Sequence, residues 1–236
     1  MLKQYIKKFV VWLAHFNIIN ACMHYVILER KSVLLRYDDE RKAPIFSLIQ
    51  KVKHSSNMLL KDNEAYQIYM IAKRTAKIPG VIAEVGVYRG GSAKLICEAK
   101  GDRPLYLFDT FDGLPDPDAC DDPKFYKGQF DDAVFEEVKN YLKGYPNVFI
   151  YQGLFPQTAQ PILDKRFSFV NLDVDIYEST RSCLEFFYPR MSRGGFILSH
   201  DYSNSAGVRR AFDEFFSSKP EAIVEMSGTQ CLVIKV

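Results

Sequence analysis

The sequence has few cysteines and no two of them close together. Its five cysteines lie at positions 22, 97, 120, 183 and 231, so no Cys-x-x-Cys pair exists. A disulfide framework or a zinc site is therefore not expected, and a reducing cytoplasm is the natural location. Cys97 and Cys183 lie among apolar neighbours in helical patterns and are predicted to be small core residues.

A large net charge, internal repeats and low-complexity tracts are also absent. The formal charge is +2 over 236 residues, too small by itself to indicate a nucleic-acid partner. Residues 1–60 hold ten basic and four acidic residues, a balance of +6, and the remainder holds 21 and 25, a balance of −4. The hydrophobic fraction of 47% suits one large globular domain with room for an appendage.

Formally charged residues are missing between Phe9 and Leu28, and no small-residue cleavage site indicates a secretory signal. Asn17, Asn20 and His24 would form one polar stripe on a helix. We therefore predict an amphipathic helix over residues 1–30, within a helical extension over 1–61. This helix would pack on the body or on a second subunit of a homo-oligomer. The first alternative is a helix that contacts a membrane surface through the basic residues of 1–31, and the least favoured alternative is a helix that spans the membrane.

Strand and helix signals alternate from residue 62 onward, where we predict that the main domain, 62–236, begins. Uninterrupted apolar runs are typical of parallel strands covered on both faces, so the pattern predicts a Rossmann-like, doubly wound α/β sheet. Two runs at the C-terminus, separated by Ser-Gly-Thr-Gln, predict a hairpin with an antiparallel last strand. The expected strands are 81–86, 105–109, 148–151, 167–173, 195–199, 222–226 and 231–236, and the expected helices are 62–76, 91–100, 131–143, 157–164, 177–190 and 206–217.

The first of these strands leads into a glycine loop, Glu84-Val85-Gly86-Val87-Tyr88-Arg89-Gly90-Gly91-Ser92. The dinucleotide fingerprint would need a glycine at Tyr88, and no Gly-Lys-Ser/Thr marks a phosphate-binding loop. An acid-x-Gly followed by a wider Gly-Gly turn suits a ligand with a charged amino-acid tail, held at a helix N-terminus. Glu84 alone is a weak signal, because an acid at a strand end is often solvated or capping.

Asp109 ends the next strand, where a carboxylate can accept hydrogen bonds from both ribose hydroxyls of an adenosine ligand. The alternative is that Asp109 only starts the following turn. The segment 112–124 has five aspartates and three prolines, and is expected to be a mobile lid or a surface excursion.

Acidic residues also follow two later strands. Asp173 and Asp175 follow one strand, and His200 and Asp201 follow the next. The ends of adjacent strands lie about 4.8 Å apart, so Asp173 and Asp201 could share one divalent ion. Asp175 could instead cap the next helix, and His200 could be a hydrogen-bonded, half-buried imidazole rather than a ligand.

These stretches resemble the TylF-type (macrocin) O-methyltransferases from about residue 64 to 236. The resemblance rests on Glu84–Ser92, on Phe108–Pro115, on Gly153-Leu154-Phe155, on Leu172–Thr180 and on His200-Asp201-Tyr202. It implies a seven-stranded methyltransferase fold, S-adenosyl-methionine as the methyl donor, a magnesium-like ion and a sugar hydroxyl as acceptor.

The resemblance also assigns residues to roles. Asp173 and Asp201 match metal ligands and Asp175 matches the general base. The family usually has an acid where this chain has His200, which puts the preference for Mg²⁺ over Mn²⁺ in doubt. The resemblance and the positions of residues at the strand ends together predict the contacts with the methyl donor. These are Glu84, Gly86, Tyr88, Gly90, Gly91, Ser92, Asp109, Thr110 and Gly153.

Two other functions fit the sequence less well. A catechol-type small-molecule O-methyltransferase would share the fold, but we would expect Asp-Asn where this chain has Asp201-Tyr202. A non-catalytic, donor-binding module of a polysaccharide assembly system would bind the donor without turnover.

Overall fold

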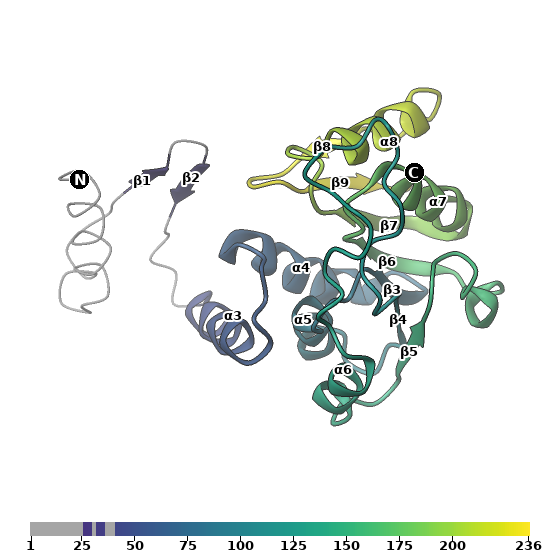
Figure 1. Ribbon diagram of the computed structural model, residues 1–236. Coiled ribbons are helices and arrows are strands. Elements are labelled where there is room, and N and C mark those ends of the chain that lie inside the picture. The colour runs from purple at the N-terminus through teal and green to yellow at the C-terminus, as the bar shows by residue number, and fades with distance from the viewer. Residues whose placement is uncertain (1–25, 30–31, 36–40) are drawn as a thin grey trace. The chain divides into compact units, whose positions relative to one another are not determined.

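The computed structural model describes residues 26–29, 32–35 and 41–236. The chain divides into two compact units, and the boundary along the sequence lies between Pro44 and Ile45. In the first unit, β1 (Val26–Glu29) and β2 (Ser32–Leu35) form an antiparallel hairpin (Figure 1). The prediction of a helix over residues 1–30 is therefore wrong at 26–29, where β-branched Val26 and Ile27 favour extended backbone. The rest of that predicted helix lies outside the described residues.

A seven-stranded sheet forms the centre of the second unit, in the order β5-β4-β3-β6-β7-β9-β8. Five strands are parallel, and β9 runs antiparallel to both of its neighbours, so the predicted hairpin and antiparallel last strand are confirmed. The strands are β3 (Val81–Val85), β4 (Leu105–Asp109), β5 (Val148–Gln152), β6 (Phe167–Leu172), β7 (Met191–Ser199), β8 (Val224–Glu225) and β9 (Cys231–Ile234).

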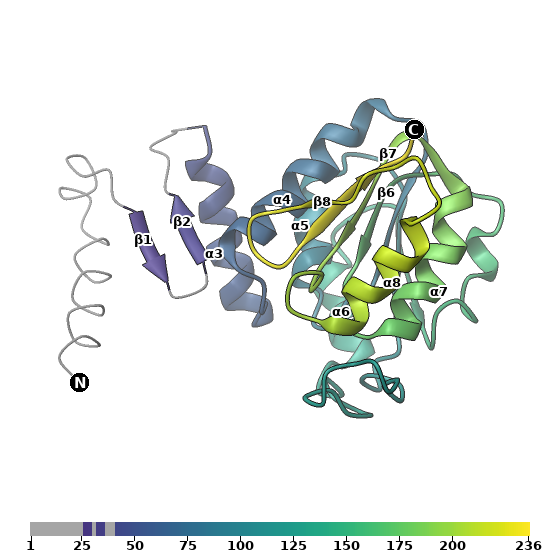
Figure 2. The same ribbon diagram turned by 90° about the horizontal axis from the view of Figure 1, so that it is seen from above.

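Helices cover both faces of this sheet, which gives three layers (Figure 2). Alternate strand residues point to opposite faces. Leu105 and Leu107 of β4 join the core beneath α3 to α6, whereas Tyr106 and Phe108 join the core beneath α7 and α8. The helices are α3 (Ala43–Ser56), α4 (Asp62–Arg74), α5 (Gly91–Ala99) and α6 (Phe135–Leu142) on the first face, and α7 (Tyr177–Phe187) and α8 (Ala206–Phe216) on the second.

The start of the sheet-bearing unit differs from the expected boundary at residue 62. The unit begins at Ile45, because Ile49 and Val52 of α3 are fully buried against the same core as α4 and α5. Helix α4 starts at Asp62, as expected, and Lys61 is its N-cap residue. Among the helices of the described part of the chain, none has the length and apolar character to cross a bilayer.

The predicted helix over 157–164 is wrong. A single 3₁₀ turn, Gln160–Ile162, replaces it. Pro161 lies in that turn and lacks an amide hydrogen, so a longer α-helical segment would lose one of its backbone hydrogen bonds.

Candidate functional site

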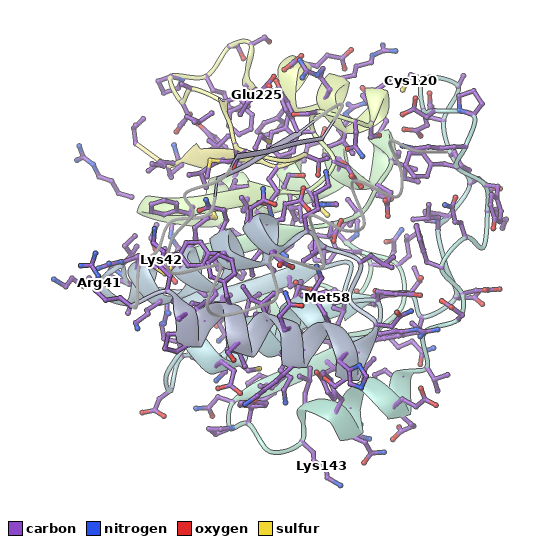
Figure 3. The ribbon with its side chains drawn as sticks, turned by 90° about the vertical axis from the view of Figure 1, so that its left-hand side faces the viewer. Arg41, Lys42, Met58, Cys120, Lys143 and Glu225 are labelled. Carbon is purple, nitrogen blue, oxygen red and sulfur yellow. The ribbon has the colours of Figure 1, made fainter. Side chains whose placement is uncertain are left out.

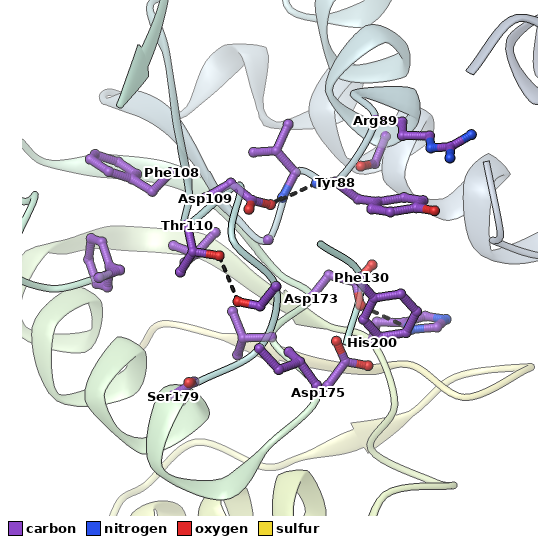
Figure 4. Close-up of a pocket in the computed structure, with 18 of the residues that line it drawn as sticks. Tyr88, Arg89, Phe108, Asp109, Thr110, Phe130, Asp173, Asp175, Ser179 and His200 are labelled. Atoms are coloured by element: carbon purple, nitrogen blue, oxygen red, sulfur yellow. Dashed lines mark hydrogen bonds and ion pairs between the residues drawn. The ribbon is translucent and has the colours of Figure 1, made fainter. Parts of the chain in front are cut away.

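A cleft opens at the carboxyl ends of β3, β4, β6 and β7, where ligands bind in open α/β sheets (Figure 4). Most of the predicted site residues line it. They lie at the ends of β3, β4, β6 and β7, in the segments that follow these strands and, for Gly153, directly after β5. Lining residues from the predicted set are Gly86, Tyr88, Gly91, Ser92, Asp109, Thr110, Gly153, Asp173, Asp175, His200 and Asp201.

Two predicted donor contacts, Glu84 and Gly90, are absent from the cleft wall. Glu84 is fully buried in β3, and its Oε1 accepts a hydrogen bond of 2.7 Å from Nδ2 of Asn171. Burial raises the pKa of Glu84 to about 8 against the hydrogen bonds from Ser92 and Asn171. Gly90 is the N-cap residue of α5 and has a φ of 78°, a left-handed conformation that suits glycine.

The glycine loop is needed partly for chain packing. Gly86 has a φ of 84°, and a Cβ there would lie 1.8 Å from the carbonyl oxygen of Asp173. Any larger residue would therefore push the end of β3 away from the end of β6. Gly86 thus allows the glycine loop to lie directly against the backbone of Asp173.

Asp109 organises the glycine loop through backbone amides. Its Oδ2 accepts hydrogen bonds of 2.7 Å from the amides of Val87 and Tyr88, and its Oδ1 accepts one of 2.7 Å from the amide of Phe111. The bond from the amide of Phe111 shows that Asp109 also starts the following turn, the alternative considered from sequence. A carboxylate has about four lone-pair sites, so roughly one is left for a ribose hydroxyl instead of the two expected.

Asp173, His200 and Asp201 come together as predicted. One potential ligand atom from each lies within 4.8 Å of the others. His200 Nδ1 is 3.1 Å from Asp173 Oδ1 and 3.2 Å from Asp201 Oδ1. Figure 4 shows Asp173, Asp175 and His200 facing the same part of the cleft.

The charges of this cluster perturb one another. Burial acts against a charged imidazole, but Asp173, Asp201 and Glu64 together raise the pKa of His200 well above its ordinary value. Burial would raise the pKa of Asp201, but hydrogen bonds and the charge of His200 lower it to about 2. Burial, with the charges of Asp173 and Asp201, raises the pKa of Asp175 well above its ordinary value. Burial also raises the pKa of Asp173, so both Asp173 and Asp175 hold a proton more strongly than a free aspartate does.

This donor set fits a divalent ion. The carboxylates of Asp173, Asp175 and Asp201 repel one another unless positive charge lies among them, and a bound divalent ion can supply that charge in place of a protonated His200. Two carboxylate oxygens and one imidazole nitrogen form a mixed oxygen and nitrogen set, which is softer than the all-oxygen sets that Mg²⁺ prefers.

Asp175 is not the cap of the next helix. Its φ is 61°, and the N-cap position of α7 is Ile176, whose side chain makes no capping bond. The capping oxygen comes instead from the aspartate-rich segment: Asp121 Oδ1 accepts the amide of Tyr177 at 2.8 Å. Asp175 is therefore left to face the cleft.

The segment 112–124 has no helix or strand and lies against the start of two helices (Figure 1). Besides the bond from Tyr177, Asp122 Oδ2 accepts the amide of Ala206, the first residue of α8, at 3.0 Å. Leu114, Pro115 and Phe130 of the same loop region line the cleft. The loop therefore joins the cleft wall to the second helical face.

Sequence reasoning missed, among other residues, an apolar group in the cleft wall and a buried acid behind His200. Met58, Leu59 and Leu60, in the turn between α3 and α4, form an apolar side of the wall (Met58 is labelled in Figure 3). Glu64 lies behind His200, with its Oε2 3.5 Å from Nε2 of the ring. An apolar triplet before a helix was a visible signal for the first group. No local pattern distinguishes Glu64 from an ordinary capping residue.

Comparison with known proteins supports a methyltransferase relationship. Residues 64–225 match the family model described as macrocin-O-methyltransferase (TylF). A tetracenomycin-C rhamnosyl 4'-O-methyltransferase of Streptomyces olivaceus is 33% identical over 144 residues, which is 55% of each chain. The mycinamicin III 3''-O-methyltransferase of Micromonospora griseorubida is 31% identical over 155 residues, covering 58% of this chain and 61% of that protein. The chain thus spans little more than half the length of these curated relatives.

Solved structures share the fold. The O-methyltransferase NovP superposes with a TM-score of 0.65 at 22% identity, covering 76% of this chain and 82% of that one. The calicheamicin methyltransferase CalS11 gives a TM-score of 0.62 at 20% identity, covering 84% and 94%. An O-methyltransferase from Bacillus cereus, solved in complex with SAH, gives 0.56 at 14% identity, covering 82% and 92%.

Proposed function

The chain belongs to the macrocin O-methyltransferase (TylF) family, and from that premise we propose that it methylates a sugar hydroxyl. The donor would be S-adenosyl-methionine, and a divalent ion would assist at Asp173, His200 and Asp201. The single observation that carries the proposal is the meeting of these three residues and Asp175 in one cleft with the glycine loop.

The donor's sulfonium supplies an already activated methyl group, so the main work of the protein is alignment and proton removal. Gly86, Gly91 and Asp109 would hold the donor at the end of β3, where the Asp109 carboxylate keeps the loop amides in place. The free amide groups at the start of α5 suit the donor's carboxylate.

Asp173, His200 and Asp201 would hold the divalent ion, which when bound supplies positive charge that lowers the pKa of a nearby hydroxyl. Asp175 would accept the proton from that hydroxyl as the general base. Its raised pKa without an ion indicates a carboxyl group with unusual proton affinity, and a cation beside it would shift that pKa downward.

A sugar acceptor is supported by the names of the relatives, which act on a rhamnosyl tetracenomycin and on mycinamicin III. The cleft agrees with such an acceptor, because it combines the polar cluster with an apolar wall at Met58, Leu59 and Leu60. The wall could hold the apolar part of a glycoside while its sugar faces the acids.

The test is transfer of labelled methyl from S-adenosyl-methionine to a panel of rhamnosides and related glycosides. Chelation should abolish turnover, and added Mg²⁺ or Mn²⁺ should restore it. Asp173→Ala and Asp201→Ala should lose metal binding and turnover together, whereas Asp164→Ala, at an exposed ion pair with Lys165, should change neither. Full activity in a metal-free sample would refute the metal half of the proposal.

Asp175→Asn separates base catalysis from metal binding. Because Asp175 is outside the three-residue ligand set, this variant should keep the metal affinity of the unaltered chain. Its turnover should fall by about 10²–10⁴-fold, the usual contribution of a general base. Unchanged turnover would remove Asp175 from the proton-transfer role.

A further inference from the structure

Glu64 places a buried carboxylate behind the imidazole of His200. Glu64 is 1% exposed, and its Oε2 lies 3.5 Å from His200 Nε2. The opposite ring nitrogen, Nδ1, faces Asp173 Oδ1 at 3.1 Å and Asp201 Oδ1 at 3.2 Å. The ring therefore turns one nitrogen to Glu64 and the other to the two carboxylates of the proposed metal site.

The carboxylate of Glu64 is held by two separate parts of the fold. Its Oε1 accepts hydrogen bonds from the amide and hydroxyl of Thr229, at 2.9 and 3.0 Å, in the turn between β8 and β9. Its Oε2 accepts the amide of Lys61 at 2.8 Å, at the start of α4. Both oxygens act as acceptors, as an ionised carboxylate does, so the group is an acceptor in a fixed position.

We propose that Glu64 is a positioning residue that accepts a hydrogen bond from Nε2–H of His200, an inference that rests on the proposed metal site. The bond fixes the tautomer and orientation of the ring and leaves the Nδ1 lone pair for the ion beside Asp173 and Asp201. A metal-binding histidine usually donates its other N–H to a carboxylate or carbonyl, which orients the ring and makes the ligating nitrogen more basic. Nε2 is buried and makes no hydrogen bond to the described residues, and the carboxylate of Glu64, 3.5 Å away, is the acceptor that the fold places beside it.

The arrangement also compensates for the charge of the ligand set. An imidazole at position 200 is neutral when it binds a metal, whereas a carboxylate there would be negative. Glu64 supplies that negative charge behind the ring and keeps the site attractive to a cation. A ligand set that includes an imidazole nitrogen favours Mn²⁺ over Mg²⁺ more than three carboxylates would.

The test is the affinity of the full chain for Mn²⁺, measured by electron paramagnetic resonance. The Glu64→Gln variant should bind Mn²⁺ about 10–100-fold more weakly, the usual cost of losing such a partner. Asn63→Ala is the matched control: Asn63 Nδ2 donates to the carbonyl of Ser227 at 2.6 Å, so it joins the same helix to the same turn without contacting His200. That control should keep the affinity of the unaltered chain.

A double-mutant cycle separates positioning from a merely structural role. Pulsed measurements on the unaltered chain should show ¹⁴N coupling from an imidazole, and His200→Asp should lose it. In the His200→Asp background, Glu64→Gln should no longer weaken Mn²⁺ binding, because no ring remains to be positioned. An equal loss of affinity in both backgrounds, or no loss in either, would overturn the role of Glu64 and leave the metal site standing.

A second measurement covers the case in which Glu64→Gln does not fold. In the ¹⁵N spectrum of the unaltered, Mg²⁺-loaded chain, the ring of His200 should carry its proton on Nε2. A proton on Nδ1 would overturn the inference. Failure of the unaltered chain to bind either Mn²⁺ or Mg²⁺ would instead overturn the metal half of the proposed function, and this inference with it.

Discussion

Asp109 combines two roles that sequence reasoning treated as alternatives. Its carboxylate accepts hydrogen bonds from three backbone amides, and these bonds start a turn and hold the glycine loop. About one lone-pair site of the carboxylate remains for a ligand. The shape of the proposed donor pocket thus depends on Asp109 through the glycine loop that it holds.

Asp109→Ala should therefore weaken binding of S-adenosyl-homocysteine by at least about tenfold, because each hydrogen bond to a charged group contributes roughly 1.5–3 kcal/mol. Calorimetry would measure the affinity. Asp112→Ala, an exposed acid of the same loop, is the control and should bind normally. Equal affinity of Asp109→Ala and the unaltered chain would place Asp109 outside the donor site.

Glu84 gives a pH-dependent prediction for stability. Burial raises its pKa to about 8 from the ordinary 4.5, so the folded chain binds more protons than the unfolded chain between these values. Stability should fall as the pH rises from about 4.5 to about 8, since ionising Glu84 costs more in the folded state.

The isosteric Glu84→Gln removes this ionisation. Its free energy of unfolding should resemble that of the unaltered chain near pH 5, and should exceed it by a growing margin towards pH 8. Urea unfolding of both chains at several pH values measures the difference. A constant difference across that range would contradict the assigned pKa.

The loop over 112–124 acts as an element of its own, although it contains neither helix nor strand. Asp121 and Asp122 accept hydrogen bonds from the first backbone amides of α7 and α8. The starts of these two helices are therefore bonded to a loop that is distant in sequence. Because Leu114 and Pro115 of the same loop line the cleft, its attachment also shapes the wall.

Replacement of Asp121 by alanine should destabilise the chain by about 0.5–2 kcal/mol, the usual cost of losing a helix cap. Hydrogen exchange should accelerate at the amide of Tyr177 and through the loop. Asp116→Ala, which removes an exposed ion pair with Lys127, is the control and should have little effect. Unaltered exchange at Tyr177 would show that the cap does not hold the loop.

For the molecule as a whole, the N-terminal region is predicted to serve packing or surface association, not catalysis. The sheet-bearing unit begins at Ile45 and contains every residue of the candidate site. Deleting residues 1–30 should leave the affinity for S-adenosyl-homocysteine unchanged while altering solubility or oligomeric state, measured by light scattering. Loss of donor binding in the deleted chain would assign this region to the site.

The sequence by itself determined the succession of strands and helices along the chain and the positions of most candidate site residues at the strand ends. Apolar runs identify buried strands, and parallel strands bring their carboxyl ends to one edge, so Asp109, Asp173 and Asp201 could be placed together from their positions alone. The glycine loop was recognisable for the same reason, since it immediately follows a strand end.

Tertiary structure decided how those residues are held. The contacts of Glu64 with Thr229 and His200, and the cap that Asp121 places on α7, join segments whose approach depends on helix packing. No local periodicity encodes such contacts, because the spacing of side chains along one element says nothing about its neighbours. For the same reason the sequence left Asp175 as either a helix cap or a base, and only the fold supplied another cap and turned Asp175 towards the cleft.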